Sequence, residues 1–435
     1  MTSQVKTFFQ LRLQKMIANI LFPSNSSDWY ASKGYKADAE IGADAFDDFI
    51  TKQSKPDSQY YKEFQNLNLQ RDMVSSQLVS GDKCQLEVMR TTPDKTITDL
   101  NQAGNGKHIV YFPGADTYYQ ACFRDISAAA KETGATIHAF NFPGTGASTG
   151  KVLESNDLIN AGIAVVNDLI KQGVHIDDII LQGDCVGSAI ANEVKNQFKE
   201  QSNMEIRVIM NNAFGSFESA VKDMITNSTW LPAFLKNAVR SLLAWTGWDM
   251  RPEDTYHGMT PYQCHLQHYG DQTLQTGTLS DAVNKHQHQS DFVDPCPAEF
   301  KDSRNRLAAK HMARLKPAQE ERLAKKFGRD SYGHANAHYA DVCELELLNR
   351  ESVYKGFVND FIASSDAYIS NHKQYMTNFE APEYLNASHE QRELTPKEQK
   401  DFAEFESTMK HLKKFDILPD ATSEEDIIPL ALQTV

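Results

Sequence analysis

Residues 179–189 read IILQGDCVGSA, the most informative stretch of the chain. An apolar run at residues 179–181 enters the motif G-x-C-x-G, and a helical pattern follows without a gap. Glycine two positions before and two positions after Cys185 lets a strand and a helix approach each other without Cβ clashes. The residue between the glycines takes a strained backbone conformation and presents its side chain at the tip of the turn. The motif therefore predicts that Cys185 is a nucleophile on a sharp turn from strand to helix.

Two other interpretations stay open. Cys185 could instead be a small buried residue at a tight turn, because free cysteines are often buried. A second motif, G-x-S-x-G at residues 146–150, offers Ser148 as a rival nucleophile. The strand before it ends at a Pro-Gly turn at residues 143–144 and no helical pattern follows, so the segment is interpreted as a loop. It also lacks the third glycine of a dinucleotide-binding loop, since a threonine stands there.

The surrounding sequence alternates short apolar runs with helical patterns, which predicts an α/β fold with a mainly parallel central sheet flanked by helices. A hairpin signal precedes the alternation, because two alternating runs at 73–79 and 84–90 are joined by a Ser-Gly-Asp-Lys turn. The predicted strands of the alternation are residues 108–112, 136–140, 179–181, 206–210 and 264–269, and the predicted helices are residues 123–131, 157–172, 188–199 and 352–366.

Shifts in this pattern divide the chain into three parts. Residues 1–72 are polar and helix-like and form a predicted N-terminal appendage. Residues 73–365 are the predicted core, which carries a helical cap insertion at about 215–260 and a charged helical insertion at about 281–330. Residues 366–435 are a predicted helical C-terminal extension with a short tail.

Composition narrows the choice of partners and compartment. Lys and Arg total 44 against 58 Asp and Glu, so the formal charge of −14 repels nucleic acid and anionic lipid on average. The six cysteines form no C-x-x-C pair, which favours reduced thiols over a disulfide framework. No apolar run is long enough to predict a transmembrane segment. Residues 5–22 are interrupted by polar side chains, which predicts an amphipathic helix, and a protein that is cytoplasmic or secreted without a Sec signal.

A cluster of five histidines between residues 257 and 288 invites a metal interpretation. Neither an H-E-x-x-H motif nor paired cysteines accompany these histidines, so their spacing is poor for metal binding. The sequence therefore predicts no metal site and no cofactor.

Three segments between residues 108 and 212 resemble the α/β-hydrolase family. Residues 111–116 (YFPGAD) are similar to the family's loop after the third strand, and residues 141–148 (NFPGTGAS) to its Gly-rich loop after the fourth strand. Residues 183–187 resemble its nucleophile elbow, with cysteine where serine is commoner. The resemblance implies an α/β-hydrolase fold and hydrolysis of an acyl bond.

The resemblance also implies the other catalytic groups, because the family's acid follows a late strand and its histidine precedes the last helix. The backbone amides of Ala115 and Val186 would form the oxyanion hole. Asp271, in a strand-Gly-Asp pattern, would be the acid. His334, in a Gly-His pair, or His338 would be the general base, held in its tautomer by the acid. Further candidates for the acid are Asp281, Asp291 and Asp294.

The cap holds three of the four tryptophans, Trp230, Trp245 and Trp248, which predicts an apolar acyl substrate bound under a lid, unless the cap simply packs on the sheet. One function is then an acyl hydrolase acting on an acyl-bearing small molecule, a lipid or an acylated protein. The other is a catalytically silent scaffold that binds a protein partner through its cap or terminal extensions. Residues 423–432 are acidic and then apolar, and are similar to C-terminal signals of type IV secreted bacterial effectors. That similarity implies an effector working in the cytoplasm of another cell.

Overall fold

The computed structural model covers the central part of the chain most fully. It describes residues 10–18, 55, 67–93, 105–115, 117–202, 204–226, 241–254, 262–266, 274, 278–279 and 352–377.

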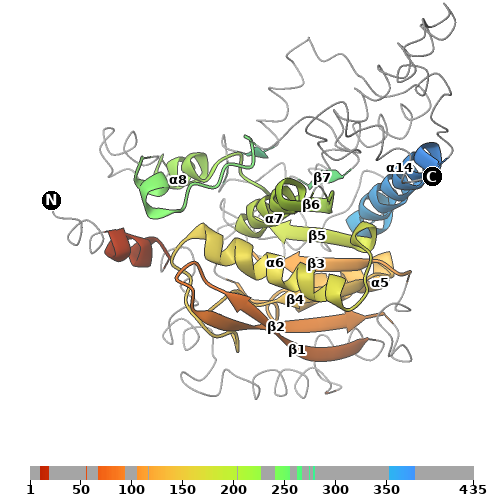
Figure 1. The fold of residues 1–435 in the computed structure, drawn as a ribbon, viewed down its shortest axis with the longest axis horizontal. Coiled ribbons are helices and arrows are strands. Elements are labelled where there is room, and N and C mark those ends of the chain that lie inside the picture. Colours follow the sequence, from red (N-terminus) through yellow and green to blue (C-terminus); the bar gives the residue numbers. More distant parts are fainter. Residues whose placement is uncertain are drawn as a thin grey trace, which may run out of the picture.

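The described strands form one seven-stranded sheet in the order β1-β2-β4-β3-β5-β6-β7 (Figure 1). The pairs β1–β2 and β2–β4 are antiparallel and the other neighbouring pairs are parallel, so among these strands β2 alone runs against the rest. A mostly parallel sheet of this order with flanking helices confirms the predicted α/β-hydrolase fold. The strands are β1 (Asn68–Gln77), β2 (Lys83–Thr92), β3 (His108–Phe112), β4 (Thr136–Phe140), β5 (Ile179–Asp184), β6 (Arg207–Asn211) and β7 (Gln263–Leu266).

Helices cover both faces of the sheet (Figure 1). One buried apolar cluster joins α6 and α7 to Phe112, and the other joins α5 and the C-terminal segment to Tyr111. Successive residues of a strand point to opposite faces, so these two neighbours belong to different layers. The elements are α5 (Phe123–Thr133), α6 (Ser155–Lys171), α7 (Val186–Ser202), α8 (Phe217–Thr226) and α14 (Asn359–Thr377), the 3-10 turn η4 (Ile176–Asp178) and the π-helical turn η7 (Val353–Val358).

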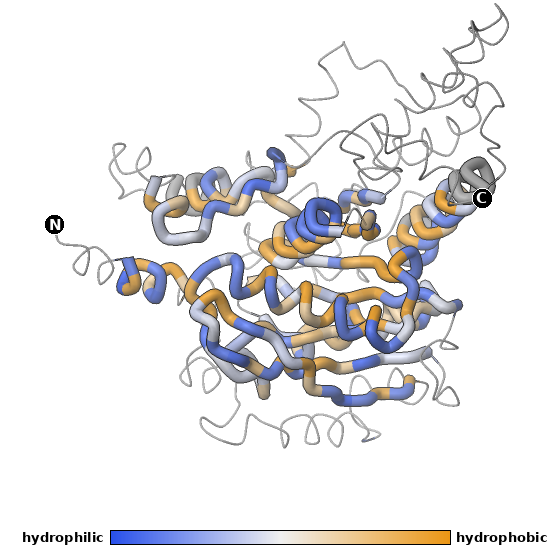
Figure 2. The backbone as a smooth tube through the Cα atoms, in the orientation of Figure 1, coloured by the Kyte–Doolittle hydropathy of each residue, from blue (hydrophilic) through white to orange (hydrophobic). Residues whose placement is uncertain are grey.

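The central strands agree most closely with the sequence pattern. β3 and β4 begin and end at the predicted residues, and every residue in them is buried. Strands buried on both faces are rich in apolar residues, so an apolar-rich run marks their full length. In Figure 2, by contrast, orange and blue alternate along the surface helix α6. β1 begins before the predicted arm and ends at Gln77, two residues short of its predicted end, while β2 extends the predicted arm at both ends. The residues added to the start of β1 are half-buried, so the apolar pattern does not mark them.

α14 is tied to the sheet by a charged cluster. Asp366 forms ion pairs with Lys107 and Arg207, each with a distance of 2.8 Å between nitrogen and oxygen. Lys107 precedes β3 and Arg207 opens β6, so the helix is fastened to the N-terminal edge of the parallel strands. α14 runs without a break through residues 365 and 366, where the sequence analysis divided core from extension.

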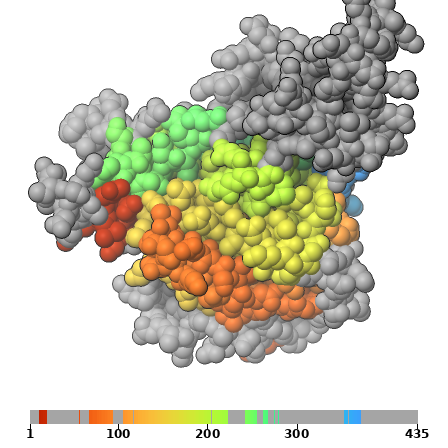
Figure 3. Space-filling model, viewed as in Figure 1, coloured from red at the N-terminus to blue at the C-terminus, as the bar shows by residue number. Residues whose placement is uncertain are grey.

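The N-terminal helix, residues 10–18, lies against residues 241–246 of the predicted cap (red beside green in Figure 3). Gln10 donates to the Trp245 carbonyl at 2.7 Å, and Gln14 donates to the Thr246 carbonyl at 3.1 Å. The last carbonyl groups of a helix lack partners within it. Two glutamines one turn apart therefore complete the end of the cap helix.

Candidate functional site

β5 ends at Asp184 and α7 begins at Val186, so Cys185 occupies the turn between them. The φ angle of Cys185 is +52°, a left-handed conformation that few non-glycine residues adopt. Its amide donates to the Asn211 carbonyl at 2.9 Å, which holds the turn against β6. Its side chain is partly buried. The predicted sharp turn from strand to helix at Cys185 is confirmed.

The two glycines of the motif are required by close backbone contacts. A Cβ atom on Gly183 would lie 2.5 Å from the amide nitrogen of Ser188, in the first turn of α7. A Cβ atom on Gly187 would lie 2.6 Å from the carbonyl oxygen of Pro113, in the loop after β3. Any larger residue would push the helix or the loop away from Cys185. The spacing of the motif is thus explained by sterics.

Ser188 locks the first turn of α7 onto the sheet, a role that the sequence analysis did not anticipate. Its hydroxyl donates to the carbonyl oxygen of Gly183 or of Asn211, and accepts from the Asn211 amide at 3.0 Å. The side chain is completely buried. Small residues are common at such turns, so the pattern alone carries no signal for this role.

The loop after β3 passes directly beside Cys185. A Cβ atom on Gly114 would lie 3.4 Å from the Asp184 carbonyl oxygen and 3.7 Å from Cys185 Cβ. Ala115 packs partly buried against the apolar cluster of the α6 face, and Val186 is buried at the start of α7. The structure thus brings both segments predicted for the oxyanion hole next to the thiol. The role of the two amides as donors stays a prediction.

Ser148 occupies a loop, as the sequence analysis interpreted it. Its hydroxyl donates to the Asn141 carbonyl at 2.8 Å and accepts from the Glu87 amide at 2.8 Å. The residue is 5% exposed. A hydroxyl that is buried and bonded on both sides ties the Gly-rich loop to β2.

Asp184 carries a carboxylate at the elbow, one residue before the thiol. It accepts a hydrogen bond from the Tyr111 hydroxyl and another from Asn211 Nδ2 at 3.0 Å. Burial, followed by the charge of Asp184, raises the pKa of Tyr111 well above its ordinary value, so the phenol stays a donor. The carboxylate thereby connects the ends of β3, β5 and β6.

A second buried polar chain links β5 to the C-terminal segment. Gln182 donates to the Tyr354 hydroxyl at 2.7 Å, and that hydroxyl donates to Asp125 Oδ2 at 2.7 Å. Tyr354 lies in η7, and Asp125 in the first turn of α5. Buried polar groups are costly unless they are paired, so this chain fixes η7 in one position against the sheet.

The predicted acid and base lie outside the described residues. This holds for Asp271, His334 and His338, and for the alternative acids Asp281, Asp291 and Asp294. The described chain reaches the end of β7 at Leu266, whose carbonyl accepts from the Asn212 amide at 2.8 Å. β7 runs parallel to β6 and β5, so it ends at the same edge of the sheet as Cys185, and Asp271 follows β7 in the sequence. Its role and those of the histidines stay predictions.

Two of the three predicted substrate-binding tryptophans can be placed, and Trp230 lies outside the described residues. Trp248 is fully buried, and its indole donates to the Leu153 carbonyl at 3.0 Å. Trp245 is partly buried, and its carbonyl accepts from Gln10. Trp248 thus packs residues 241–254 against the start of α6, and substrate binding by the tryptophans stays a prediction.

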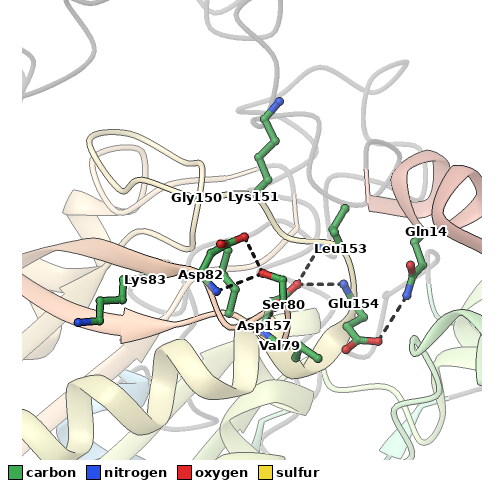
Figure 4. Close-up of a pocket in the computed structure, with 11 residues that line it drawn as sticks. Gln14, Val79, Ser80, Asp82, Lys83, Gly150, Lys151, Leu153, Glu154 and Asp157 are labelled. Carbon is green, nitrogen blue, oxygen red and sulfur yellow. Dashed lines mark hydrogen bonds between the residues drawn. The ribbon is translucent and has the colours of Figure 1, made fainter.

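A cavity of about 670 Å³ lies beside the turn between β1 and β2 (Figure 4). Cys185 and the loop after β3 do not line it. Its walls come from the β1–β2 turn, the loop before α6 and the N-terminal helix, with Gln14, Ser80, Lys83, Lys151 and Glu154 among the lining residues. Glu154 accepts from Gln14 across it at 3.4 Å.

The described residues contain no group of three or more His, Cys, Asp or Glu side chains arranged to hold a metal ion. None of the described helices combines the length and the apolar character needed to cross a membrane. Burial raises the pKa of Cys84 and, more strongly, of Cys264, so these thiols resist ionisation. Cys122, like Cys185, is partly exposed.

One protein family matches a limited part of the chain. Residues 333–394 match the family described as the C-terminal domain of SdbC. The match includes η7 and α14, which pack against α5 and the sheet. No curated protein matches the chain.

Several solved structures are similar to the chain at low identity. An alpha-beta hydrolase from Vibrio vulnificus is 15% identical with a TM-score of 0.38, and the match covers 60% of this chain and 79% of that one. An esterase from Pyrococcus furiosus is 15% identical with a TM-score of 0.36, covering 51% and 76%. Carboxyl esterase 2 from the mycorrhizal fungus Tuber melanosporum is 15% identical with a TM-score of 0.37, covering 57% and 85%. The assignment of the fold rests on the strand order and directions given above.

Proposed function

We propose that the protein is an acyl hydrolase, an esterase, lipase or thioesterase, with Cys185 as its nucleophile. The observation that carries the proposal is the left-handed φ angle of Cys185 at a turn that glycine sterics hold in place. A strained residue between strand and helix is characteristic of a nucleophile, because strain is retained where chemistry needs the exposed position. A merely structural cysteine would relieve that strain in an ordinary conformation.

In the proposed reaction, the thiolate of Cys185 attacks the acyl carbonyl carbon, and the carbonyl electrons move onto oxygen. The amides of Ala115 and Val186 would donate to that oxyanion. Its collapse breaks the bond to the leaving group, which takes the proton that His334 or His338 removed from the thiol. Water, deprotonated by the same histidine, then hydrolyses the thioester and restores the thiol. Asp271 would orient the histidine.

The proposed substrate has an apolar acyl chain. Support comes from the apolar cap, whose base is packed by Trp248 and Phe217 with ring centroids 6.4 Å apart. If the cap covers the nucleophile, as the proposal requires, it would exclude water and bind an acyl chain by burial of its surface. The donor could be a small molecule, a lipid or an acylated protein.

The proposed place of action is the cytoplasm of another cell. Support comes from residues 423–432, with their acidic block and apolar end. Secretion assays with and without these residues test this part separately from the chemistry.

The deciding experiment replaces Cys185 with Ala and follows turnover of a short p-nitrophenyl ester together with labelling by an acyl-enzyme probe. We expect both to be abolished in Cys185→Ala. The matched control is Cys122→Ala, which removes another partly exposed thiol and should retain both. Labelling of Cys185 by iodoacetamide should be faster than that of Cys122 in the wild type.

Turnover that survives in Cys185→Ala would overturn the proposal. Equal labelling rates for Cys185 and Cys122, without ester turnover, would favour the silent scaffold instead. Loss of turnover in Ser148→Ala alone would make Ser148 the nucleophile, against its buried and bonded position.

A further inference from the structure

Glu87 is a buried carboxylate that the proposed reaction does not use. It lies on β2 with no exposed surface. Arg71 Nε donates to its Oε1 at 2.9 Å, while Asn141 Nδ2 and the Ala147 amide donate to its Oε2 at 2.9 and 3.0 Å. A charge in the interior persists only when its oxygens are paired. Glu87 therefore holds its partners in fixed directions.

The carboxamide of Asn141 is oriented by this carboxylate. A carboxylate can only accept, so Nδ2 of Asn141 must face Glu87 and Oδ1 must face the other way. On that side, Oδ1 accepts from the backbone amide of Tyr119 at 3.0 Å. Gly146 completes the arrangement, because a Cβ atom there would lie 2.8 Å from Glu87 Oε2. Asn141 itself is fully buried at the end of β4.

Tyr119 belongs to the loop between β3 and α5, which also contains Gly114 and Ala115. One end of this loop touches the elbow, where a Cβ atom on Gly114 would lie 3.7 Å from Cys185 Cβ. The bond from Asn141 anchors the loop on its far side. Backbone hydrogen bonds within the loop join Ala121 to Tyr118 and Cys122 to Tyr119, so they shape its end next to α5. The bond from Asn141 adds a side-chain anchor that ties this turn to the end of β4.

We propose that Asn141, held by Glu87, is a positioning residue that fixes the loop after β3 and so presents the Ala115 amide to the oxyanion. This inference rests on the proposed function, because it concerns the oxyanion hole of that reaction. Asn141 does not touch substrate and acts through the Tyr119 amide. Displacement of a donor by a fraction of an ångström is enough to weaken its effect on the transition state.

Two reactions of the Cys185 thiol distinguish the loss of this positioning role from a general loss of structure around the site. Alkylation of Cys185 by iodoacetamide forms no oxyanion, whereas ester hydrolysis passes through one. Asn141→Ala should lower kcat for a p-nitrophenyl ester by about 10- to 100-fold with little change in KM. The rate of Cys185 alkylation should stay within about twofold of the wild type, since the elbow is held by other contacts.

The matched control is Ser148→Ala. It removes two buried hydrogen bonds from the same Gly-rich loop and leaves the Tyr119 anchor in place. We expect a lower melting temperature with kcat close to wild type. Asn141→Asp should be at least as damaging as Asn141→Ala, because it places a second carboxylate beside Glu87. The exchange of both groups, Glu87→Gln with Asn141→Asp, should recover part of the lost kcat.

Amide hydrogen exchange of residues 113–121 tests the anchor without any substrate. Both variants are expected to lower stability, but only Asn141→Ala removes the bond to the Tyr119 amide. Exchange in this loop should therefore be faster in Asn141→Ala than in Ser148→Ala. Unchanged exchange in Asn141→Ala, or equal loss of alkylation and hydrolysis, would overturn the positioning role. Altered exchange in a protein whose wild type hydrolyses no ester would support the anchor and overturn the proposed function instead.

Discussion

The C-terminal and N-terminal edges of the parallel strands differ in how they are built. At the C-terminal edge, Cys185 and Asn212 are the two non-glycine residues of the described chain with positive φ angles. At the N-terminal edge, Lys107, Arg207 and Asp366 form ion pairs that fasten α14. The C-terminal edge thus has strained backbone beside a thiol, and the N-terminal edge has ion pairs between charged side chains. The comparison shows that strained backbone and paired charges lie at opposite ends of the same strands.

The N-terminal edge also contains a buried histidine pair. His108 Nδ1 lies 3.1 Å from His138 Nε2, and their rings stack with centroids 5.3 Å apart. Burial lowers the pKa of His108 to about 4, and burial also lowers the pKa of His138. One neutral ring donates to the other in this state. The pair is therefore a stabilising feature only while both rings are uncharged.

The largest effect should follow from adding one methyl group at the C-terminal edge. Gly187→Ala places a Cβ atom against the backbone of the loop after β3, which cannot move away without displacing the elbow. We expect a loss of about 4 kcal/mol or more in the free energy of unfolding, measured by urea titration. Gly106→Ala is the matched control at the other edge, with φ of +77° and open space around it. It should cost about 1 kcal/mol.

Acid should weaken the N-terminal edge. The unfolded chain binds protons at its histidines below pH 6.5, while folded His108 stays neutral down to about pH 4, so stability is lost as the pH falls through this window. The contribution of His108 amounts to about 3 kcal/mol between pH 7 and pH 4. Urea titrations at several pH values, compared with His108→Asn, measure it. If the free energy of unfolding fell equally steeply with pH in the wild type and in His108→Asn, the expectation would be contradicted.

Removing the charge that fastens α14 should have an intermediate effect. Asp366→Asn leaves the buried Arg207 with weaker acceptors, Ser365 Oγ among them. Because Asp366 is 35% exposed, we expect a loss of only about 2 kcal/mol in thermal or urea unfolding. The rate of Cys185 alkylation should not change. A slower alkylation would show that the two edges are coupled.

The smallest effect should come from Tyr111→Phe at the C-terminal edge. It removes the hydrogen bond from the phenol to Asp184 and leaves the ring in the core. Water can replace the donor because Asp184 is only partly buried, so we expect a cost of about 1 kcal/mol. Calorimetric melting checks this value. A loss of unfolding free energy as large as that of Gly187→Ala would mean that Asp184 is the main contact that holds the turn at Cys185 in place.

Much of the sheet could be predicted from the sequence. Apolar runs such as residues 108–112 and 136–140 coincide with β3 and β4 because both faces of these strands are buried, and burial leaves a continuous apolar pattern. The turn at Cys185 was predictable for a different reason. The motif places both glycines and the start of a helix within a few positions of Cys185, and the contact of Gly183 with Ser188 is local, although Gly187 meets Pro113 in the distant loop after β3.

The anchors of the site were not predictable in the same way. Glu87 looks like an ordinary strand residue, and Asn141 like an ordinary turn residue, until β2 and β4 pair and bring them together. Ser148 lies in a motif that matches a nucleophile, yet its hydroxyl is hydrogen-bonded to the Asn141 carbonyl and to the Glu87 amide. Hydrogen bonds between residues 50 or more positions apart leave no periodic trace in a sequence.

The order of the strands and helices along the chain and the turn at Cys185 follow from the amino-acid sequence alone, because periodicity and the contact between Gly183 and Ser188 act over short stretches of chain. Three contacts depend on the tertiary structure instead. Glu87 orients Asn141 toward the Tyr119 amide, and the Ser148 hydroxyl is hydrogen-bonded on both sides. Asp366 ties α14 to the N-terminal edge of the parallel strands. These contacts depend on which strands become neighbours. That choice is made by the packing of the whole sheet, since a side chain finds a distant partner only after the strands between them are in place.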